Sequence, residues 1–118
     1  MSETSHSVRI LLPTAPPDVA EALARGLVEE RLAACVNVLP GVRSVYRWAG
    51  AVQNDPESLL VVKSTESRCE ALEARLRAEH PYEVPELVAF RPTHVSPPYL
   101  DWLQAAVTEP SEGDATSS

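Results

Sequence analysis

Apolar residues near the start of the chain occur first as a short run and then at helical spacing. Val8 to Leu12 form an apolar run that ends at Pro13, which predicts a buried strand. Thr14 is expected to cap the helix that follows, with the next prolines in its first turn. The apolar positions three and four residues apart predict one buried helix face; they are Ala20, Leu23, Ala24, Leu27, Val28 and Leu32.

The middle of the chain alternates in the way that is typical of strands. Residues 33–39 and 42–48 indicate one strand that is interrupted at Pro40-Gly41 and then resumes. Ala49–Asp55 is expected to be a turn region, because Gly50 and the Asn-Asp-Pro sequence break regular structure. Ser58–Lys63 is predicted to be a strand, and its continuous apolar centre suggests burial on both faces.

The second half of the chain predicts two further helices and one further strand. Residues 67–70 match a capping box, and the helix they open is expected to end at His80-Pro81. Leu87–Phe90 is predicted to be the last strand, and residues 96–107 a short last helix. A single domain is therefore expected over residues 8–107, between a disordered N-terminus, residues 1–7, and a disordered acidic tail, residues 108–118.

The order of these elements defines the fold class. It predicts an α+β, ferredoxin-like βαββαβ arrangement: an antiparallel sheet with two helices on one face, plus a short C-terminal helix. This fold carries many unrelated functions. Residues 33–48, if extended at ~3.3 Å per residue, would span about 50 Å, although a domain of this size is roughly 35 Å across. The hairpin of residues 42–62 is therefore expected to overhang its sheet and to pair with another chain.

Composition and charge exclude several classes of protein. The chain has 118 residues, 44% of them hydrophobic, which is enough for one core, and no apolar run approaches the ~18 residues of a membrane span. The polar N-terminus has no signal-peptide pattern, so the cytoplasm is expected. Cys35 and Cys69 are expected to be inert buried thiols. The net charge of −7 and the scattered arginines argue against nucleic-acid binding.

The candidate chemistry is concentrated in residues 80–86, His-Pro-Tyr-Glu-Val-Pro-Glu. An imidazole with carboxylates in a stiff turn suits Cu(II), Zn(II) or Ni(II), whereas the alternative is a rigid turn with solvated charges. Glu57 is a second candidate ligand, and its alternative interpretation is a solvated carboxylate at a strand start. Tyr46 and Trp48, with Tyr99 and Trp102, are candidates for a small-molecule pocket or for core and interface packing.

With these motifs in place, the chain resembles the CutA family of divalent-cation tolerance proteins over about residues 8–107. The resemblance rests on several motifs in one order, namely Thr14-Ala15-Pro16, Leu32-Ala33-Ala34-Cys35-Val36-Asn37, Pro40-Gly41, Ser44-Val45-Tyr46-Arg47-Trp48 with Gly50, Glu57 ahead of Lys63, residues 80–86, Thr93-His94 and Tyr99-Leu100 with Trp102-Leu103. It implies a ferredoxin-like subunit in a tight trimer with strands paired between neighbours. It also implies a role in tolerance of copper and other divalent cations, with no established enzymatic reaction.

The chain departs from the family pattern at the proposed copper ligands. Some relatives carry a cysteine before Thr-Ala-Pro and two histidines before Pro-Tyr, and here these positions are Pro13, Glu79 and His80. The family's frequent Trp-Glu-Gly-Lys is Trp48-Ala49-Gly50-Ala51, and a usual glutamate near the turn is Gln53. A soft thiolate site for Cu(I) is therefore not expected. Instead, we expect a harder site that is built from His80 and carboxylates.

Together these observations predict a cytoplasmic homotrimer that is not an enzyme and has no nucleic-acid or membrane partner. It is expected to bind Cu(II) or another divalent cation, not tightly, near its intersubunit clefts through His80, Glu83 and Glu57. The residues expected to line the clefts are Tyr46, Trp48, Lys63, Tyr82 and Glu86. One alternative is a small-molecule sensor like the PII signalling proteins, whose trimer the family's resembles. Another is a hydrolase of the acylphosphatase kind, although this chain lacks the basic phosphate-binding loop of such enzymes.

Overall fold

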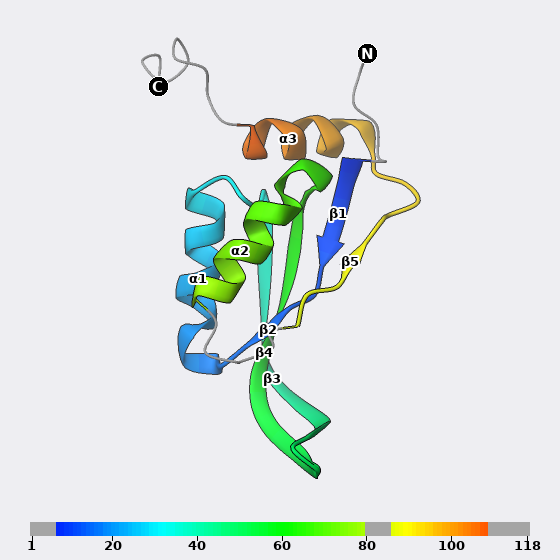
Figure 1. Ribbon diagram of the computed structural model, residues 1–118. Coiled ribbons are helices and arrows are strands. Elements are labelled where there is room, and N and C mark those ends of the chain that lie inside the picture. The colour runs from blue at the N-terminus through cyan, green and yellow to red at the C-terminus, as the bar shows by residue number, and fades with distance from the viewer. Residues whose placement is uncertain (1–6, 80–85, 109–118) are drawn as a thin grey trace.

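The computed structural model describes residues 7–79 and 86–108, whose strands form one antiparallel sheet (Figure 1). In chain order the elements are β1 (Val8–Leu11), β2 (Thr14–Ala15), α1 (Pro17–Glu29), β3 (Cys35–Trp48), β4 (Ala51–Thr65), α2 (Cys69–Glu79), β5 (Ala89–Phe90) and α3 (Pro97–Val107). This order confirms the predicted ferredoxin-like fold. The pattern predicts four strands, and the structure adds the two-residue strand β2.

The sheet has β4 and β1 at its centre. β4 pairs with β3 along one side and with β1 and β2 along the other, and β5 pairs with the far side of β1. Helices α1 and α2 lie together on one face of this sheet (Figure 1). We call the opposite face, which β4 lines with Leu59, Val61 and Lys63, the open face. At one end of the sheet α3 packs against Val8 of β1. Val8 lies on the open face, because Leu11, three residues further along the strand, faces α1 and α2.

The main core lies between the sheet and the two helices. Strands β1 and β4 and helices α1 and α2 contribute its largest fully buried aliphatic side chains, which are Leu11, Leu27, Leu60, Val62, Leu72 and Leu76. Burying one such side chain contributes about 1.5–3 kcal/mol relative to leaving it exposed. Cys69 packs at the edge of this core and Cys35 is partly buried, and both are free thiols. Within the described residues no helix is long and apolar enough to cross a bilayer.

Helix α3 is fixed to the body at its C-terminal end. Leu103 and Val107 are buried against the sheet. The Arg31 guanidinium donates to the Ala106 carbonyl oxygen at 3.0 Å, and Nε of Arg68 donates to the Val107 carbonyl oxygen at 2.8 Å. The last carbonyl groups of a helix have no partners within the helix, and positive charge is favourable there. The two arginines therefore satisfy the end of α3 while tying it to the segments that follow α1 and β4.

The β3–β4 hairpin extends far beyond the helices (Figure 1). We call residues 42–48 and 51–57 the arm; they pair from Val42 opposite Glu57 to Trp48 opposite Ala51, after a bulge between Leu39 and Val42. The radius of gyration is 15.7 Å and the longest extent 52 Å, whereas a compact domain of this length has a radius near ~13 Å. The structure thus confirms the predicted overhang.

The prediction of a turn region over Ala49–Asp55 is wrong. Ala49 and Gly50 alone make the turn, with φ of 54° and 79°, and β4 already begins at Ala51. Two successive residues with positive φ form the tight hairpin turn that matches strand twist. Pro56 is tolerated within β4 because the arm's β4 segment pairs only with β3 among the described strands, and proline is accepted on such an edge.

Two boundaries near the first helix differ from the sequence-based expectation. Thr14 does not cap α1; it pairs with Leu59 in the sheet, and Pro16 occupies the cap position. The helix ends at Glu29 rather than near Leu32, because the chain turns at Arg31 with φ of 59°. The left-handed conformation at that residue ends the helix, as it does after many helices.

The capping box at residues 67–70 and the extent of the last strand also need correction. A 3-10 turn over Glu66–Arg68 precedes α2, and the Ser67 hydroxyl lies 3.0 Å from that of Thr65. The helix proper starts at Cys69. The last strand is confined to Ala89–Phe90, not Leu87–Phe90, because only these two residues pair with β1.

Replacing Ala49 by Asn is expected to stabilise the folded protein. Ala49 holds a left-handed conformation that costs a residue with a β-carbon about 1–2 kcal/mol, whereas asparagine followed by glycine favours this turn. We expect the free energy of unfolding to rise by about 1 kcal/mol in urea denaturation. Gly50→Ala, at φ of 79°, is the opposite control and should lower it. A destabilising Ala49→Asn change would contradict the assigned turn.

Candidate functional site

Glu57 lies at the base of the arm and is almost completely buried. Its side chain is 4% exposed, and it pairs with Val42 at the point where the arm leaves the body. The alternative of a solvated carboxylate at a strand start is therefore wrong. A carboxylate is seldom buried unless it is paired, because burial of a charge is costly, and Glu57 does make a polar or electrostatic interaction. Asp55, two residues earlier in β4, points to the same face of the arm.

Tyr46 links the two strands of the arm on that face. Its hydroxyl donates a hydrogen bond to Oδ2 of Asp55 at 2.6 Å. This hydrogen bond, followed by burial and by the negative charges of Asp55 and Glu57, raises the pKa of Tyr46 above its usual value. The phenol therefore stays protonated at neutral pH and serves as a donor. Two carboxylates and a phenol thus share one face of the arm.

The role of Asp55 is not part of the sequence-based prediction. The expected turn region over Ala49–Asp55 hid it, because alternation carries no information inside a turn. Once β4 is extended to Ala51, the spacing of Asp55 and Glu57 places both carboxylates on one strand face. The sequence feature that could have identified Asp55 is therefore its spacing of two residues from Glu57 within a strand.

Alkaline titration of Tyr46 tests the bond to Asp55. We expect Asp55→Asn to shift the ultraviolet titration of Tyr46 to lower pH, because the hydrogen bond and charge that raise its pKa are lost. In the parent, the stabilisation from protonated Tyr46 is present below the unfolded-state pKa and is lost as pH rises through the higher folded-state pKa. Tyr82→Phe and Tyr99→Phe in the same chain leave one tyrosine to observe. An unchanged titration would argue against the contact.

Trp48 lies at the far end of the arm, on the same face as Tyr46. The two residues are 45% and 42% exposed. Gln53 Nε2 donates to the Trp48 carbonyl oxygen at 3.4 Å and braces the tip. The structure therefore brings Tyr46 and Trp48 together on an exposed strand face, and neither belongs to a core cluster.

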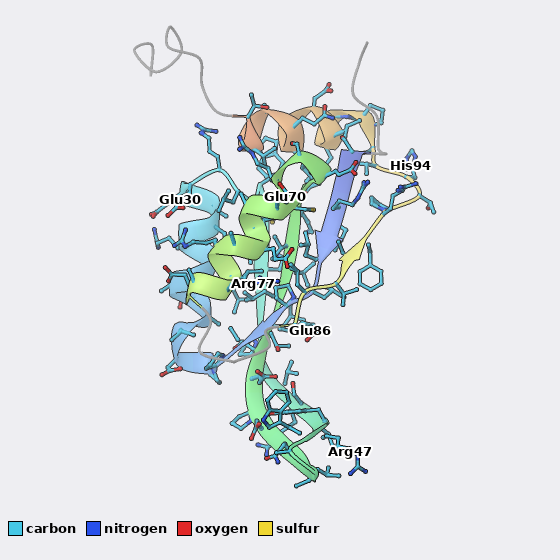
Figure 2. All side chains as sticks on the ribbon, in the orientation of Figure 1. Glu30, Arg47, Glu70, Arg77, Glu86 and His94 are labelled. Carbon is cyan, nitrogen blue, oxygen red and sulfur yellow. The ribbon has the colours of Figure 1, made fainter. Side chains whose placement is uncertain are left out.

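The remaining predicted residues fall in three places. His80, Tyr82 and Glu83 lie outside the described residues. Glu86 is exposed and lies near the level at which the arm leaves the body, whereas His94 lies in a loop toward the opposite end (Figure 2). Lys63 pairs with Ile10 and Cys35 in the body of the sheet. It is six residues from Glu57 along β4, or roughly 20 Å.

The donor atoms at the arm base are oxygens, not sulfur. Cys69 packs at the edge of the core, where its thiol contacts the Thr65 carbonyl oxygen at 3.6 Å and burial raises its pKa. Position 13, before Thr14, is a buried proline. Among residues 7–79 and 86–108, no three His, Cys, Asp or Glu side chains come together as a metal site. The carboxylate oxygens at the arm base are hard ligands, of the kind that harder divalent cations prefer.

A cavity of about 530 Å³ lies elsewhere, at the end of the sheet where α3 packs. None of the predicted site residues lines this cavity; its lining consists of Ser7, Thr65, Glu66, Ser67, Arg68, Gln104, Val107 and Thr108. The aromatic rings of Tyr99 and Trp102 pack at 5.3 Å on α3. These two rings thus belong to α3 and not to the arm.

Comparison with known families identifies one match over most of the chain. The family described as CutA1 divalent ion tolerance protein matches residues 9–106. The divalent-cation tolerance protein CutA of Thermus thermophilus is 48% identical over 95 residues, which cover 80% of this chain and 92% of that protein. A chloroplastic protein CutA of Arabidopsis thaliana is 42% identical over 103 residues, 87% of this chain and 57% of the plant protein.

Solved structures agree with these sequence relationships. The structure of the divalent cation tolerance protein Cut A1 from Thermus thermophilus has a TM-score of 0.82 and 47% identity, covering 86% of this chain and 99% of that one. A structure titled PII-like protein CutA from Nostoc sp. PCC 7120 in apo form has a TM-score of 0.80 and 36% identity. It covers 85% of this chain and 97% of the Nostoc chain.

Proposed function

We propose that this chain, which belongs to the CutA1 divalent ion tolerance protein family, binds a divalent cation weakly at the base of its arm. The observation that carries the proposal is the buried carboxylate of Glu57, which shares an arm face with Asp55 and Tyr46. A divalent cation compensates the charge of such carboxylates directly. The protein acts in the cytoplasm and in metal tolerance rather than in catalysis.

The proposed ligands are Glu57 from the arm and His80 and Glu83 from the segment after α2. Neutral imidazole and carboxylate oxygens suit Cu(II), which also binds most tightly in the general order of divalent metals. Cu(II) is therefore expected to bind more tightly than Zn(II). With a proline at position 13 and no thiolate at the arm base, the affinity is expected to be modest.

The proposed assembly is a homotrimer whose subunits pair through strands of the arm. Both outer edges of the arm lack a partner strand among the described residues. The arm also exposes Val45 by 65% and Val52 by 64%. A long bare strand edge with exposed aliphatic residues is a site of aggregation unless another chain covers it. Three copies of 12.8 kDa give a mass of about 38 kDa. In the proposed trimer the arm bases lie in the clefts between subunits.

Calorimetric titration with Cu(II) tests the cation site. We expect His80→Ala to remove most of the binding, because it takes away the imidazole ligand, and Glu57→Gln or Glu83→Gln to weaken it partially. Binding should also weaken as pH falls through about 6.5, because a protonated imidazole cannot bind metal. The trimer mass, measured by light scattering, should be the same for every variant.

His94→Ala is the matched control for the copper titration. His94 is an exposed histidine in a loop remote from the arm (Figure 2), so its removal should leave Cu(II) binding nearly unchanged. If His80→Ala binds Cu(II) like the parent, the segment after α2 has a structural role and the cation site is refuted. If His94→Ala causes the larger loss, the site lies at the other end of the molecule.

A second candidate function is that of a small-molecule sensor. It is favoured by the exposed rings of Tyr46 and Trp48 on one arm face, together with Glu86 near the arm base and with Tyr82 and Lys63 as further proposed lining residues. The Nostoc relative is called PII-like in its title. Equilibrium dialysis against nucleotides and metabolites, in parallel with Cu(II), separates the two functions, because only a sensor would retain an organic ligand without metal.

A further inference from the structure

Among the residues that the structure describes, the open face carries one charged side chain in the body of the sheet. Lys63, the single lysine of the chain, is partly buried near the C-terminal end of β4. The strand register places its side chain between Ile10 of β1 and Cys35 of β3, and alternation places Val61 and Thr65 beside it along β4. None of these four neighbours carries a charge.

Among the residues that the structure describes, Lys63 differs from four of the arginines in forming no ion pair. Arg9, Arg25, Arg75 and Arg77 form ion pairs with glutamates. Within residues 7–79 and 86–108, by contrast, the Lys63 ammonium makes no hydrogen bond or ion pair. An ammonium group that loses water without gaining a partner destabilises the structure, and covering the open face would remove still more water.

The polar groups around Lys63 are hydrogen-bond donors. Tyr99 reaches the open face from α3 and lies against the Cys35 thiol; burial first and then Cys35 raise the pKa of Tyr99, so its hydroxyl remains protonated. Asn37 lies two residues further along β3. Its Oδ1 accepts a hydrogen bond from the Cys35 thiol at 3.9 Å, and its side chain is exposed, which leaves the side-chain NH₂ as a donor. An ammonium, a phenol and an amide, with no carboxylate among the described strand neighbours of Lys63, are the chemistry that binds an anion.

We infer that Lys63, with Asn37 and Tyr99, forms a binding site for a small oxyanion, a carboxylate or a phosphate, on the open face of the sheet. The inference rests on the proposed function in one respect: assembly of the subunits would cover the open face and shield the site from water. It differs from the cation site in ligand charge and in place, since Lys63 is roughly 20 Å from Glu57 along β4. The bound anion supplies the charge that the lysine lacks.

Thermal unfolding of the full chain tests the site, with inorganic phosphate and malonate as the two probes. Each is compared with chloride at equal ionic strength, because electrostatic screening is then the same; the Lys63 variants control for the general stabilising effect of phosphate on folded proteins. At an anion concentration about tenfold above the dissociation constant, we expect the melting temperature of the parent to rise by roughly 5 °C. The larger shift identifies the ligand as a phosphate or as a carboxylate. A parent that responds to neither anion beyond chloride overturns the inference.

Lys63 variants show whether the response comes from this site. Lys63→Met keeps the length of the side chain without its charge and should lose the shift, whereas Lys63→Arg should retain most of it. Arg25→Met, which removes a side chain that is 75% exposed on α1, is the matched control and should respond like the parent. If Lys63→Met does not fold, Lys63→Gln serves in its place. An undiminished response without the lysine overturns the inference.

Two further measurements separate this inference from the proposed function. Cu(II) titration and light scattering on the same samples report the cation site and the assembly; a copper-binding trimer without an anion response overturns only the anion site. A monomer whose anion response depends on Lys63 retains the site and overturns the assembly. If Glu57→Gln and Lys63→Met are energetically coupled in a double-mutant cycle, a carboxylate of a second copy is the partner, and the anion site is overturned.

Discussion

Shortening the arm is expected to abolish the proposed trimer. The register places Ser44 opposite Asp55, so residues 45–54 can be replaced by a two-residue Asn-Gly turn without shifting the remaining pairs. This change removes the exposed Val45 and Val52 and most of the arm's bare strand edges. Light scattering at micromolar concentration should give about 12 kDa or heterogeneous aggregates, against about 38 kDa for the parent.

The control retains the arm and changes only its surface. Val45→Thr with Val52→Thr keeps two β-branched residues in the strands but makes the exposed face more polar, so pairing through the backbone edges should persist. A shortened protein that remains a trimer would show that the arm is not the assembly element. Loss of the trimer in the threonine variant alone would assign assembly to the side chains of the arm rather than to its strand edges.

The fold was largely predictable because its core obeys simple periodicities. Leu23 and Leu27 recur at helical spacing and are buried in α1, and the continuous apolar segment around Leu60 is the centre of β4. The overhang followed from strand length alone, since an extended segment of residues 33–48 cannot fit inside a domain of this size. These features depend on local pattern and on chain geometry.

The errors arose where tertiary contacts outweigh local signals. Thr14 has the side chain of a helix cap, but pairing with Leu59 in the sheet draws it into β2. Asn54-Asp55-Pro56 would break an isolated strand, but the neighbouring strand β3 supplies partners on one side and the other edge tolerates proline. Propensity is a weak guide in such cases because its energies are smaller than those of an extended hydrogen-bonded ladder.

The candidate site was predictable only in part for a related reason. Glu57 stands out in the sequence, but its burial depends on how the arm meets the body. Asp55 and its bond to Tyr46 appear only when the strand register is known. The isolation of Lys63 likewise depends on which residues the sheet places beside it. Sequence motifs therefore identify the chemical groups, whereas cross-strand pairing decides which of them act together.

Leu60→Ala is expected to be the most destabilising single substitution considered for the subunit. Leu60 is 0% exposed, in the centre of the core beneath α1 and α2, and its backbone N–H donates to the Pro13 carbonyl oxygen at 2.9 Å. Truncating such a leucine leaves a cavity and lowers the free energy of unfolding by about 2–5 kcal/mol. Urea denaturation measures this loss, at one fixed protein concentration because the stability of an oligomer depends on it.

Leu59→Ala is the matched comparison, because Leu59 is the neighbouring leucine of β4 on the open face. It is partly buried and faces away from the helices, beside Leu39 on β3. We expect its truncation to lower the urea midpoint less than Leu60→Ala, yet to favour dissociation of the proposed trimer on dilution, since the proposed assembly would cover the open face. Equal midpoint losses with an unchanged trimer would mean that both leucines serve the subunit core, and the open face would then lose its role in assembly.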